Sequence, residues 1–209
     1  MRIALIHALR HSPPPIEAAF AALWPQPQLM NLLDDSLSAD LAREGLLTEA
    51  ITQRFLTLAR YAVGTGAAAI LFTCSAFGPC IERVKQEFAR LPVLKPNEAM
   101  IEEAAGAGRR IGLLATFPAT LVSMPQEFPD GVEVRTQLAQ GALAALDTGD
   151  GAAHDRLAAE AAASLVGCDV IALAQFSLAR AREAVAARTG AKILTTPESA
   201  VSKLRALLT

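Results

Sequence analysis

Short apolar runs alternate with longer amphipathic segments along the chain. The first run, residues 2–6, is typical of a buried strand. Ser12 followed by Pro13 predicts the start of a helix that continues to about Trp24, because serine is a frequent N-cap and proline fits the first helical position. Residues 29–33 predict the next strand. The chain therefore begins as strand, helix and strand.

The pattern continues in the same way through the first half of the chain. We interpret the polar segment DDSLSADL, residues 34–41, as a loop. Apolar residues from Ile51 to Ala62 then recur at helical spacing and predict a helix that packs on a sheet and ends at Gly64. The predicted elements that follow are a strand at 67–72, a helix from Pro79 and a short strand at 93–94.

The second half of the chain shows the same alternation. Predicted strands lie at 111–114, 132–134, 170–173 and 193–194, and predicted helices lie at 118–124, 138–146, 154–166, 178–188 and from Pro197. Alternating strands and helices indicate an α/β fold with a mostly parallel sheet flanked by helices.

Two parts of the sequence resemble each other in order. RIALIHAL at 2–9 aligns with RIGLLATF at 110–117, and LFTCSAFG at 71–78 aligns with ALAQFSLA at 172–179. Pro96 and Pro197 keep the offset of the second pair. An ordered set of repeats predicts two similar α/β halves. We expect these halves to face each other across a cleft.

Composition and charge exclude several classes of partner. The 209 residues are 52% hydrophobic and carry a formal net charge of -2, with 19 scattered lysines and arginines. They form no basic stripe for nucleic acid. The apolar run at 3–6 is too short for a signal peptide, and no stretch approaches the ~18 apolar residues that span a membrane. We therefore expect a cytoplasmic protein with no membrane partner.

Cysteine and histidine spacing gives no support for a metal or a disulfide framework. Cys74, Cys80 and Cys168 are an odd number and form no CxxC motif. The histidines show no paired spacing on a helix. A flavin is also not indicated, because no serine- and threonine-rich phosphate loop follows the first strand. The sequence predicts no metal and no cofactor.

The chemistry should lie where the predicted strands end. In parallel sheets, ligands bind beyond the carboxyl ends of the strands, next to helix N-termini that favour anions. A small carboxylic acid is therefore the expected ligand. The candidate residues at these ends are His7, Arg10, Thr73, Cys74, Ser75, Asn97, Thr116, Gln175, Phe176 and Ser177.

Cys74 is the candidate for catalysis. A thiol just before a helix N-terminus is expected to have a lowered pKa, which would make it a competent base or nucleophile. The alternative is that Cys74 is a small core residue, as Cys80 and Cys168 are expected to be.

Several of the other candidates also have structural interpretations. His7 could be a base or a substrate donor, or only a hydrogen-bonded structural residue. Arg10 suits a second carboxylate, Thr116 is expected to cap a helix, and Phe176 could shape a pocket or simply be buried. Asp34 and Asp35 are interpreted as structural loop residues.

The arrangement of these motifs resembles the aspartate/glutamate/hydantoin racemase superfamily over nearly the whole chain. The resemblance rests on TCSAFG and AQFSLA at matching places. It implies two flavodoxin-like halves, 1–97 joined by the C-terminal helix 198–209, and 98–197. It also implies cofactor-independent proton transfer next to a carboxylate. Cys74 matches the first family cysteine, and Thr73, Ser75 and Ala76 match the carboxylate-binding loop.

The sequence departs from the family pattern at the second cysteine. Family members typically carry one cysteine in each half, whereas Gln175 stands at the second position and cannot take up a proton near neutral pH. The alternatives are therefore a racemase-type isomerase, a single-base decarboxylase or cis-trans isomerase of the same superfamily, and a non-catalytic carboxylate-binding module. A homodimer is expected only by analogy with this architecture.

Overall fold

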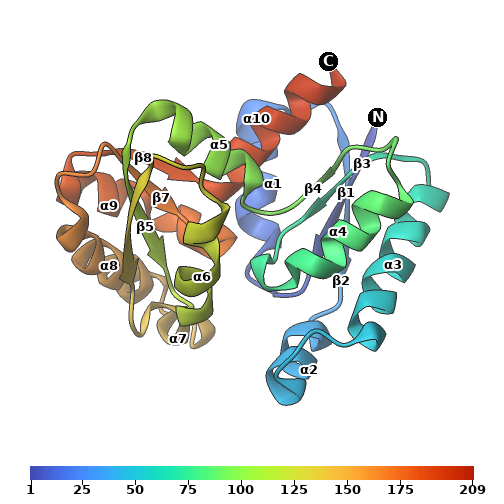
Figure 1. Cartoon of the computed structure of the whole chain (residues 1–209), viewed down its shortest axis with the longest axis horizontal. Coiled ribbons are helices and arrows are strands. Elements are labelled where there is room, and N and C mark those ends of the chain that lie inside the picture. Colours follow the sequence, from blue (N-terminus) through green and yellow to red (C-terminus); the bar gives the residue numbers. More distant parts are fainter. The chain divides into compact units, whose positions relative to one another are not determined.

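The structure, a computed structural model, describes all residues from 1 to 209. The chain folds into two compact units (Figure 1). Unit 1 contains Met1–Pro96 and Ala200–Thr209, and unit 2 contains Asn97–Ser199. Each unit has a four-stranded parallel sheet flanked by helices, which confirms the predicted fold class. None of the helices is long and apolar enough to cross a membrane.

Unit 1 has the strand order β2-β1-β3-β4, with every pair parallel. Helices α3 and α4 lie on one face of the sheet and α1 on the other (Figure 1). Helix α10 (Thr196–Leu208) belongs to this unit from Ala200 onward, and its Arg205 donates to the carbonyl of Leu23 at 3.0 Å. The elements of this unit are β1 (Arg2–His7), α1 (Pro13–Leu23), β2 (Gln28–Leu33), α2 (Ser36–Glu44), α3 (Glu49–Gly64), β3 (Ala67–Phe72), η1 (Ser75–Phe77), α4 (Gly78–Glu87) and β4 (Val93–Leu94).

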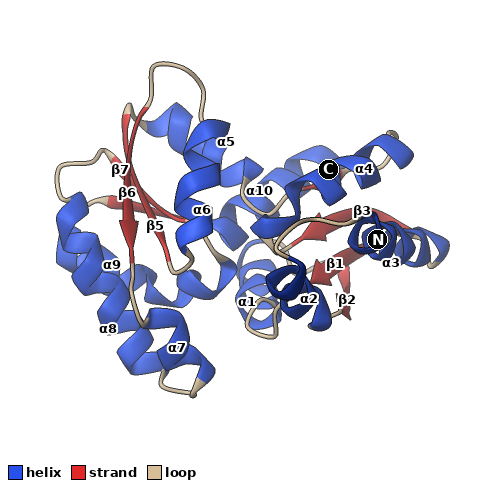
Figure 2. Cartoon of the chain, turned by 60° about the horizontal axis from the view of Figure 1, so that its bottom comes forward, coloured by secondary structure: helices blue, strands red, loops and turns tan.

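Unit 2 repeats this plan with the strand order β6-β5-β7-β8. Helices α5 and α6 lie on one face of its sheet, and α8 and α9 lie on the other (Figure 2). Its elements are α5 (Glu98–Ala107), β5 (Arg110–Ala115), α6 (Pro118–Ser123), η2 (Met124–Glu127), β6 (Glu133–Leu138), α7 (Ala142–Asp147), α8 (Gly151–Ala162), η3 (Ala163–Leu165), β7 (Val170–Leu173), η4 (Phe176–Ala181), α9 (Arg182–Thr189), β8 (Lys192–Thr195) and the start of α10, up to Ser199.

The internal repeat is visible at the ends of the central strands. Cys74 follows β3 in extended conformation and precedes η1, and Gln175 follows β7 in the same conformation and precedes η4. The backbone of Thr73 donates to Ile6, and that of Ala174 donates to Leu114, at corresponding places in the two sheets. Cys74 and Gln175 are therefore equivalent positions of two similar folds.

The predicted loop at 34–41 is wrong, because residues 36–44 form helix α2. Leu37 is fully buried, and Leu41, four residues later, packs against the same core. Two leucines at this spacing lie on one helix face. Gly45, in the left-handed conformation, ends the helix. The polar side chains between the leucines had hidden this pattern.

Two differences occur near the start and in the middle of unit 2. The pattern did not predict α5, although Met100, Ile101 and Ala104 are buried on its inner face. Leu138 is the last residue of β6 rather than the start of a helix, and α7 begins only at Ala142. Partly exposed edge strands such as β6 have weak apolar patterns, so their ends are difficult to read from sequence.

Candidate active site

The carboxyl ends of β1 and β3 bring three predicted residues together in unit 1. The two strands pair in parallel, with Ile6 opposite Phe72. Thr73 continues this pairing, since its backbone N–H donates to the carbonyl of Ile6 at 3.0 Å. His7, Thr73 and Cys74 therefore lie at the same edge of the sheet, as parallel pairing predicts.

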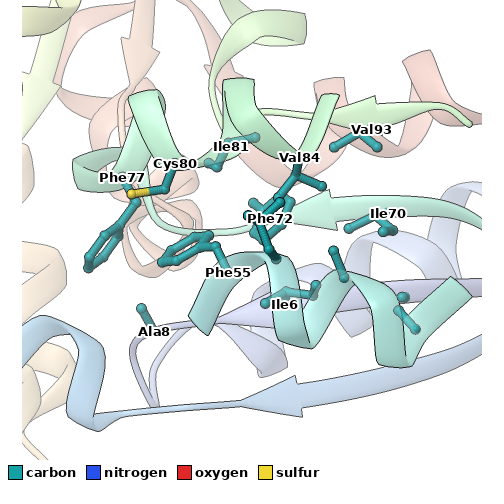
Figure 3. Close-up of a cluster of buried hydrophobic side chains, with 14 of the residues drawn as sticks. Ile6, Ala8, Phe55, Ile70, Phe72, Phe77, Cys80, Ile81, Val84 and Val93 are labelled. Carbon is teal, nitrogen blue, oxygen red and sulfur yellow. The ribbon is translucent and has the colours of Figure 1, made fainter. Parts of the chain in front are cut away.

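Two buried aromatic residues hold the loop that carries Cys74. Phe72 precedes the loop and Phe77 ends η1, and both pack against Phe55 of α3 (Figure 3). The ring centroids are 5.3 Å apart for Phe55 and Phe72 and 4.9 Å apart for Phe55 and Phe77. Stacked or tilted aromatic pairs at such distances add to the stabilisation that burial provides. The segment that carries Cys74 is thus anchored in the core at both ends.

Cys74 is a partly buried residue of this loop and packs against the core of unit 1. Burial raises the pKa of its thiol to about 11, although the backbone N–H of Ala76 and the hydroxyl of Ser38 are close enough to donate to the thiolate, and both lower the pKa. The predicted lowering of the Cys74 pKa is therefore wrong. Burial removes water from around the sulfur and destabilises the thiolate. This effect is larger than the stabilisation of the thiolate by the two hydrogen-bond donors.

Ser38 is a site residue that the sequence interpretation missed, because it lies on α2. Its hydroxyl donates to the carbonyl of Ala8 at 2.9 Å, next to the end of β1. Arg54 of α3 forms ion pairs with Asp34, just before α2, and with Asp40 within it. The buried Leu37 and these ion pairs fix α2 so that Ser38 reaches the thiol.

His7 is fully buried, and both of its ring nitrogens have partners within unit 1. Nδ1 is 2.8 Å from the hydroxyl of Thr73, and Nε2 is 2.9 Å from Oδ1 of Asn31. The amide of Asn31 in turn donates to Glu17 at 2.6 Å. Burial lowers the pKa of His7, while the Asn31 hydrogen bond and the charge of Glu17 act in the opposite direction. Asn31 and Glu17 were not predicted as site residues.

The remaining candidates of unit 1 differ in exposure. Arg10 is highly exposed and forms an ion pair with Asp35 at 2.6 Å, so its charge already has a carboxylate partner. Ser75 is partly buried and Ala76 is exposed, both within η1. Asp34 and Asp35 lie at the entry to α2, in keeping with the structural role predicted for them.

Gln175 is the central residue at the corresponding edge of unit 2. Its Oε1 accepts the backbone N–H of Thr116 and the hydroxyl of Thr116, the latter at 2.8 Å. Thr116 therefore does not cap a helix as predicted, and the N-cap of α6 is Phe117. With its oxygen occupied by two donors, Gln175 presents its amide NH₂ as the group able to contact a ligand.

The other predicted residues of unit 2 are buried. Phe176 and Ser177 lie within η4, and Asn97 precedes α5. The side-chain oxygen of Asn97 accepts the hydroxyl of Thr196 at 3.3 Å. These contacts are internal to unit 2.

The cysteines away from the site are core residues, as predicted. Cys80 lies within α4 and packs in the cluster shown in Figure 3, and Cys168 is buried beside β7. The structure contains no group of three histidine, cysteine or acidic side chains placed to hold a metal ion.

Comparison with known proteins gives a family match over most of the chain. A family model described as Asp/Glu/Hydantoin racemase matches residues 4–204. No curated protein matches the sequence significantly.

Several solved structures share the fold at low sequence identity. Glutamate racemase from Francisella tularensis superposes with a TM-score of 0.72 at 18% identity, covering 99% of this chain and 80% of the other. Allantoin racemase from Klebsiella pneumoniae gives 0.74 at 17%, covering 100% and 87%. An aspartate racemase homologue from Pyrococcus horikoshii gives 0.70 at 17%, covering 99% and 98%. At this identity the structures establish the shared fold.

Proposed function

The chain belongs to the Asp/Glu/hydantoin racemase family, and on this premise we propose that Cys74 transfers a proton at the alpha carbon of a small carboxylic acid. A racemase-type isomerase that needs no cofactor fits the family and the fold. The observation that carries the role of Cys74 is its position. Cys74 is a partly buried residue just beyond the carboxyl end of β3, and two hydrogen-bond donors lie within reach of its sulfur.

The environment of Cys74 gives a thiolate that is a strong base but forms in only a small fraction of the molecules near neutral pH. A pKa of about 11 keeps the resting thiol neutral, but it also gives the thiolate a high affinity for a proton. The thiolate removes the proton from the alpha carbon, so that a C–H bond breaks and an S–H bond forms. The electron pair moves into the carboxylate and gives an enediolate. Return of a proton from sulfur to the same face regenerates the substrate and exchanges its alpha hydrogen with solvent, once the thiol has itself exchanged. Inversion additionally requires that a proton reach the opposite face of the enediolate.

Ser38 and the backbone N–H of Ala76 are the groups that stabilise the thiolate in this proposal. Both can donate to the sulfur once it is ionised, and a hydrogen bond to a charged acceptor is stronger than one to a neutral acceptor. Ser75 and the backbone N–H groups at the start of η1 are the proposed donors to the substrate carboxylate, as expected for the start of a helix.

Gln175 favours single-base chemistry as a second candidate function. It occupies the position equivalent to Cys74, and an amide cannot exchange a proton near neutral pH. Its oxygen is also bound by Thr116, which leaves only donor character. A decarboxylase or cis-trans isomerase can work with one thiol; in a decarboxylase the thiol protonates the enediolate that remains after CO₂ leaves. Direct racemisation needs proton transfer on both faces of the substrate carbon.

Exchange in heavy water tests the proposal. The protein is incubated with a panel of amino acids, dicarboxylates and cyclic ureides, and deuterium at the alpha carbon is followed by NMR. We expect exchange that Cys74→Ala abolishes and that Cys168→Ala, a matched change of a core cysteine, retains. Inversion of configuration identifies racemisation, and release of CO₂ identifies decarboxylation. Saturable binding without exchange, unchanged in Cys74→Ala, would instead identify a carboxylate-binding module and refute the catalytic role.

Two sequence predictions accompany this proposal. We propose a homodimer on the analogy of the architecture alone, and sedimentation velocity would measure it. The proposed cytoplasmic location is tested by fractionating cells that produce the protein.

A further inference from the structure

Four residues of unit 1 form an unbroken chain of hydrogen bonds from the surface to the loop of Cys74. The chain begins at Glu17, which is exposed on α1, and passes through Asn31 of β2 to the buried His7. It ends at the hydroxyl of Thr73, the residue before Cys74. Its three links measure 2.6, 2.9 and 2.8 Å.

The direction of each bond follows from the chemistry of its members. An ionised carboxylate only accepts hydrogen bonds, so the NH₂ of Asn31 must point to Glu17. The oxygen of Asn31 is then turned toward His7, and Nε2 of His7 must carry a hydrogen to bond with it. The proton on His7 is therefore positioned by a carboxylate that His7 does not contact.

The second ring nitrogen of His7, Nδ1, faces the hydroxyl of Thr73. The ring is fully buried, its direct polar partners are an amide and a hydroxyl, and burial disfavours the charged form. A neutral ring with its hydrogen on Nε2 has a lone pair on Nδ1, which accepts the hydroxyl of Thr73 at 2.8 Å. The alternative acceptor for this hydroxyl, the carbonyl of Ile6, is more distant at 3.4 Å.

We propose that Glu17 and Asn31 hold His7 as the neutral Nε2–H tautomer and that His7 in turn directs the hydroxyl proton of Thr73 inward. His7 is then a positioning residue rather than a base or a substrate ligand. Thr73 cannot donate to a substrate carboxylate while its proton is bound to Nδ1. This changes the role expected for Thr73 in the carboxylate-binding loop, where Ser75 and backbone N–H groups remain as donors.

The tautomer is measured directly by two-dimensional ¹H–¹⁵N NMR of the histidine ring nitrogens, with the His7 signals assigned by their loss in His7→Gln. We expect one protonated nitrogen, Nε2, and one unprotonated nitrogen, Nδ1, at pH 7. Glu17→Lys replaces the acceptor at the surface end by a donor. Asn31 should then turn its oxygen to Lys, which forces the ring hydrogen from Nε2 to Nδ1. Glu44→Lys, the same charge change at an exposed position on α2, should leave the tautomer unchanged.

A second experiment, which rests on the proposed function, measures alpha-proton exchange in variants of His7. It distinguishes a positioning role of His7 from acid-base catalysis. A glutamine amide offers one donor and one acceptor, as the neutral ring does, but it cannot titrate. In His7→Gln the rate of alpha-proton exchange should stay within about threefold of the wild-type rate. In His7→Leu the rate should fall about tenfold, which is the effect expected from the loss of one hydrogen bond. If the wild type shows no exchange, the proposed function fails and the NMR result still decides the tautomer. A ring with Nδ1 protonated in the wild type, a tautomer unmoved by Glu17→Lys, or a His7→Gln variant as inactive as His7→Leu would overturn the inference.

Discussion

Removing the hydroxyl of Ser38 should make the thiol of Cys74 less reactive. Ser38 is one of the two donors to the sulfur, and its single hydrogen also bonds to the carbonyl of Ala8 in the resting protein. A hydrogen bond to a charged group contributes about 1.5–3 kcal/mol, and breaking the bond to Ala8 costs about 1 kcal/mol. The net stabilisation of the thiolate by Ser38 is therefore on the order of 1 kcal/mol. This corresponds to a pKa increase of about 0.7 in Ser38→Ala.

Alkylation by iodoacetamide measures this effect, because only the thiolate reacts. The rate at Cys74 is followed from pH 7 to pH 10 by mass spectrometry of the peptide that contains it. A pKa of about 11 predicts a rate that rises tenfold per pH unit without a plateau over this range. In Ser38→Ala the rate should be about fivefold lower at each pH, as a pKa higher by about 0.7 requires.

Ser36→Ala is the matched control on the same helix. The hydroxyl of Ser36 contacts Asp34 and Arg54 and does not reach the sulfur, so its loss should change the rate less than twofold. Truncation at position 38 can also open access to the thiol, but that would increase the rate, which is the opposite sign. A plateau below pH 9, or an unchanged or faster rate in Ser38→Ala, would refute the reasoning about burial and Ser38.

Three further predictions concern stability. Phe77→Ala should lower the free energy of unfolding, measured in urea, by about 3–4 kcal/mol, because it removes a fully buried ring that contacts Phe55. Phe77→Leu should lower it less, and equal losses in the two variants would contradict the aromatic anchoring. Folding lowers the pKa of His7, so this residue takes up a proton in the unfolded chain at a higher pH than in the folded protein. The contribution of neutral His7 to the free energy of unfolding is therefore complete above about pH 6.5 and is lost as the pH falls below that value. His7→Gln should flatten this part of the pH–stability curve, and an unchanged slope would count against a buried neutral ring. Thr116→Val should cost about 1 kcal/mol through its lost bond to Gln175, whereas Thr116→Ser should restore the wild-type melting temperature if the hydroxyl is responsible.

Much of the fold and part of the candidate site follow from local patterns in the sequence. The apolar runs at 2–6 and 67–72 predict two buried strands, and their parallel pairing is enough to place His7, Thr73 and Cys74 at one edge of a sheet. The repeat of these runs in the second half predicts that Gln175 occupies the place equivalent to Cys74, and the extended backbone at both positions agrees. Such inferences succeed because strand period and strand ends depend on neighbouring residues.

Only the tertiary structure decided what these residues can do chemically. The direction of the Cys74 pKa depends on burial and on Ser38, which reaches the thiol from a helix that the polar pattern at 34–41 had concealed. The state of His7 depends on Asn31 and Glu17, which lie on two other elements. Desolvation and hydrogen bonding are sums over all atoms around a group, and most of those atoms come from distant parts of the chain. For this reason the sequence alone determined where the thiol stands. The packing of α2 against Cys74, and of α1 and β2 around His7, determined the protonation of these two groups.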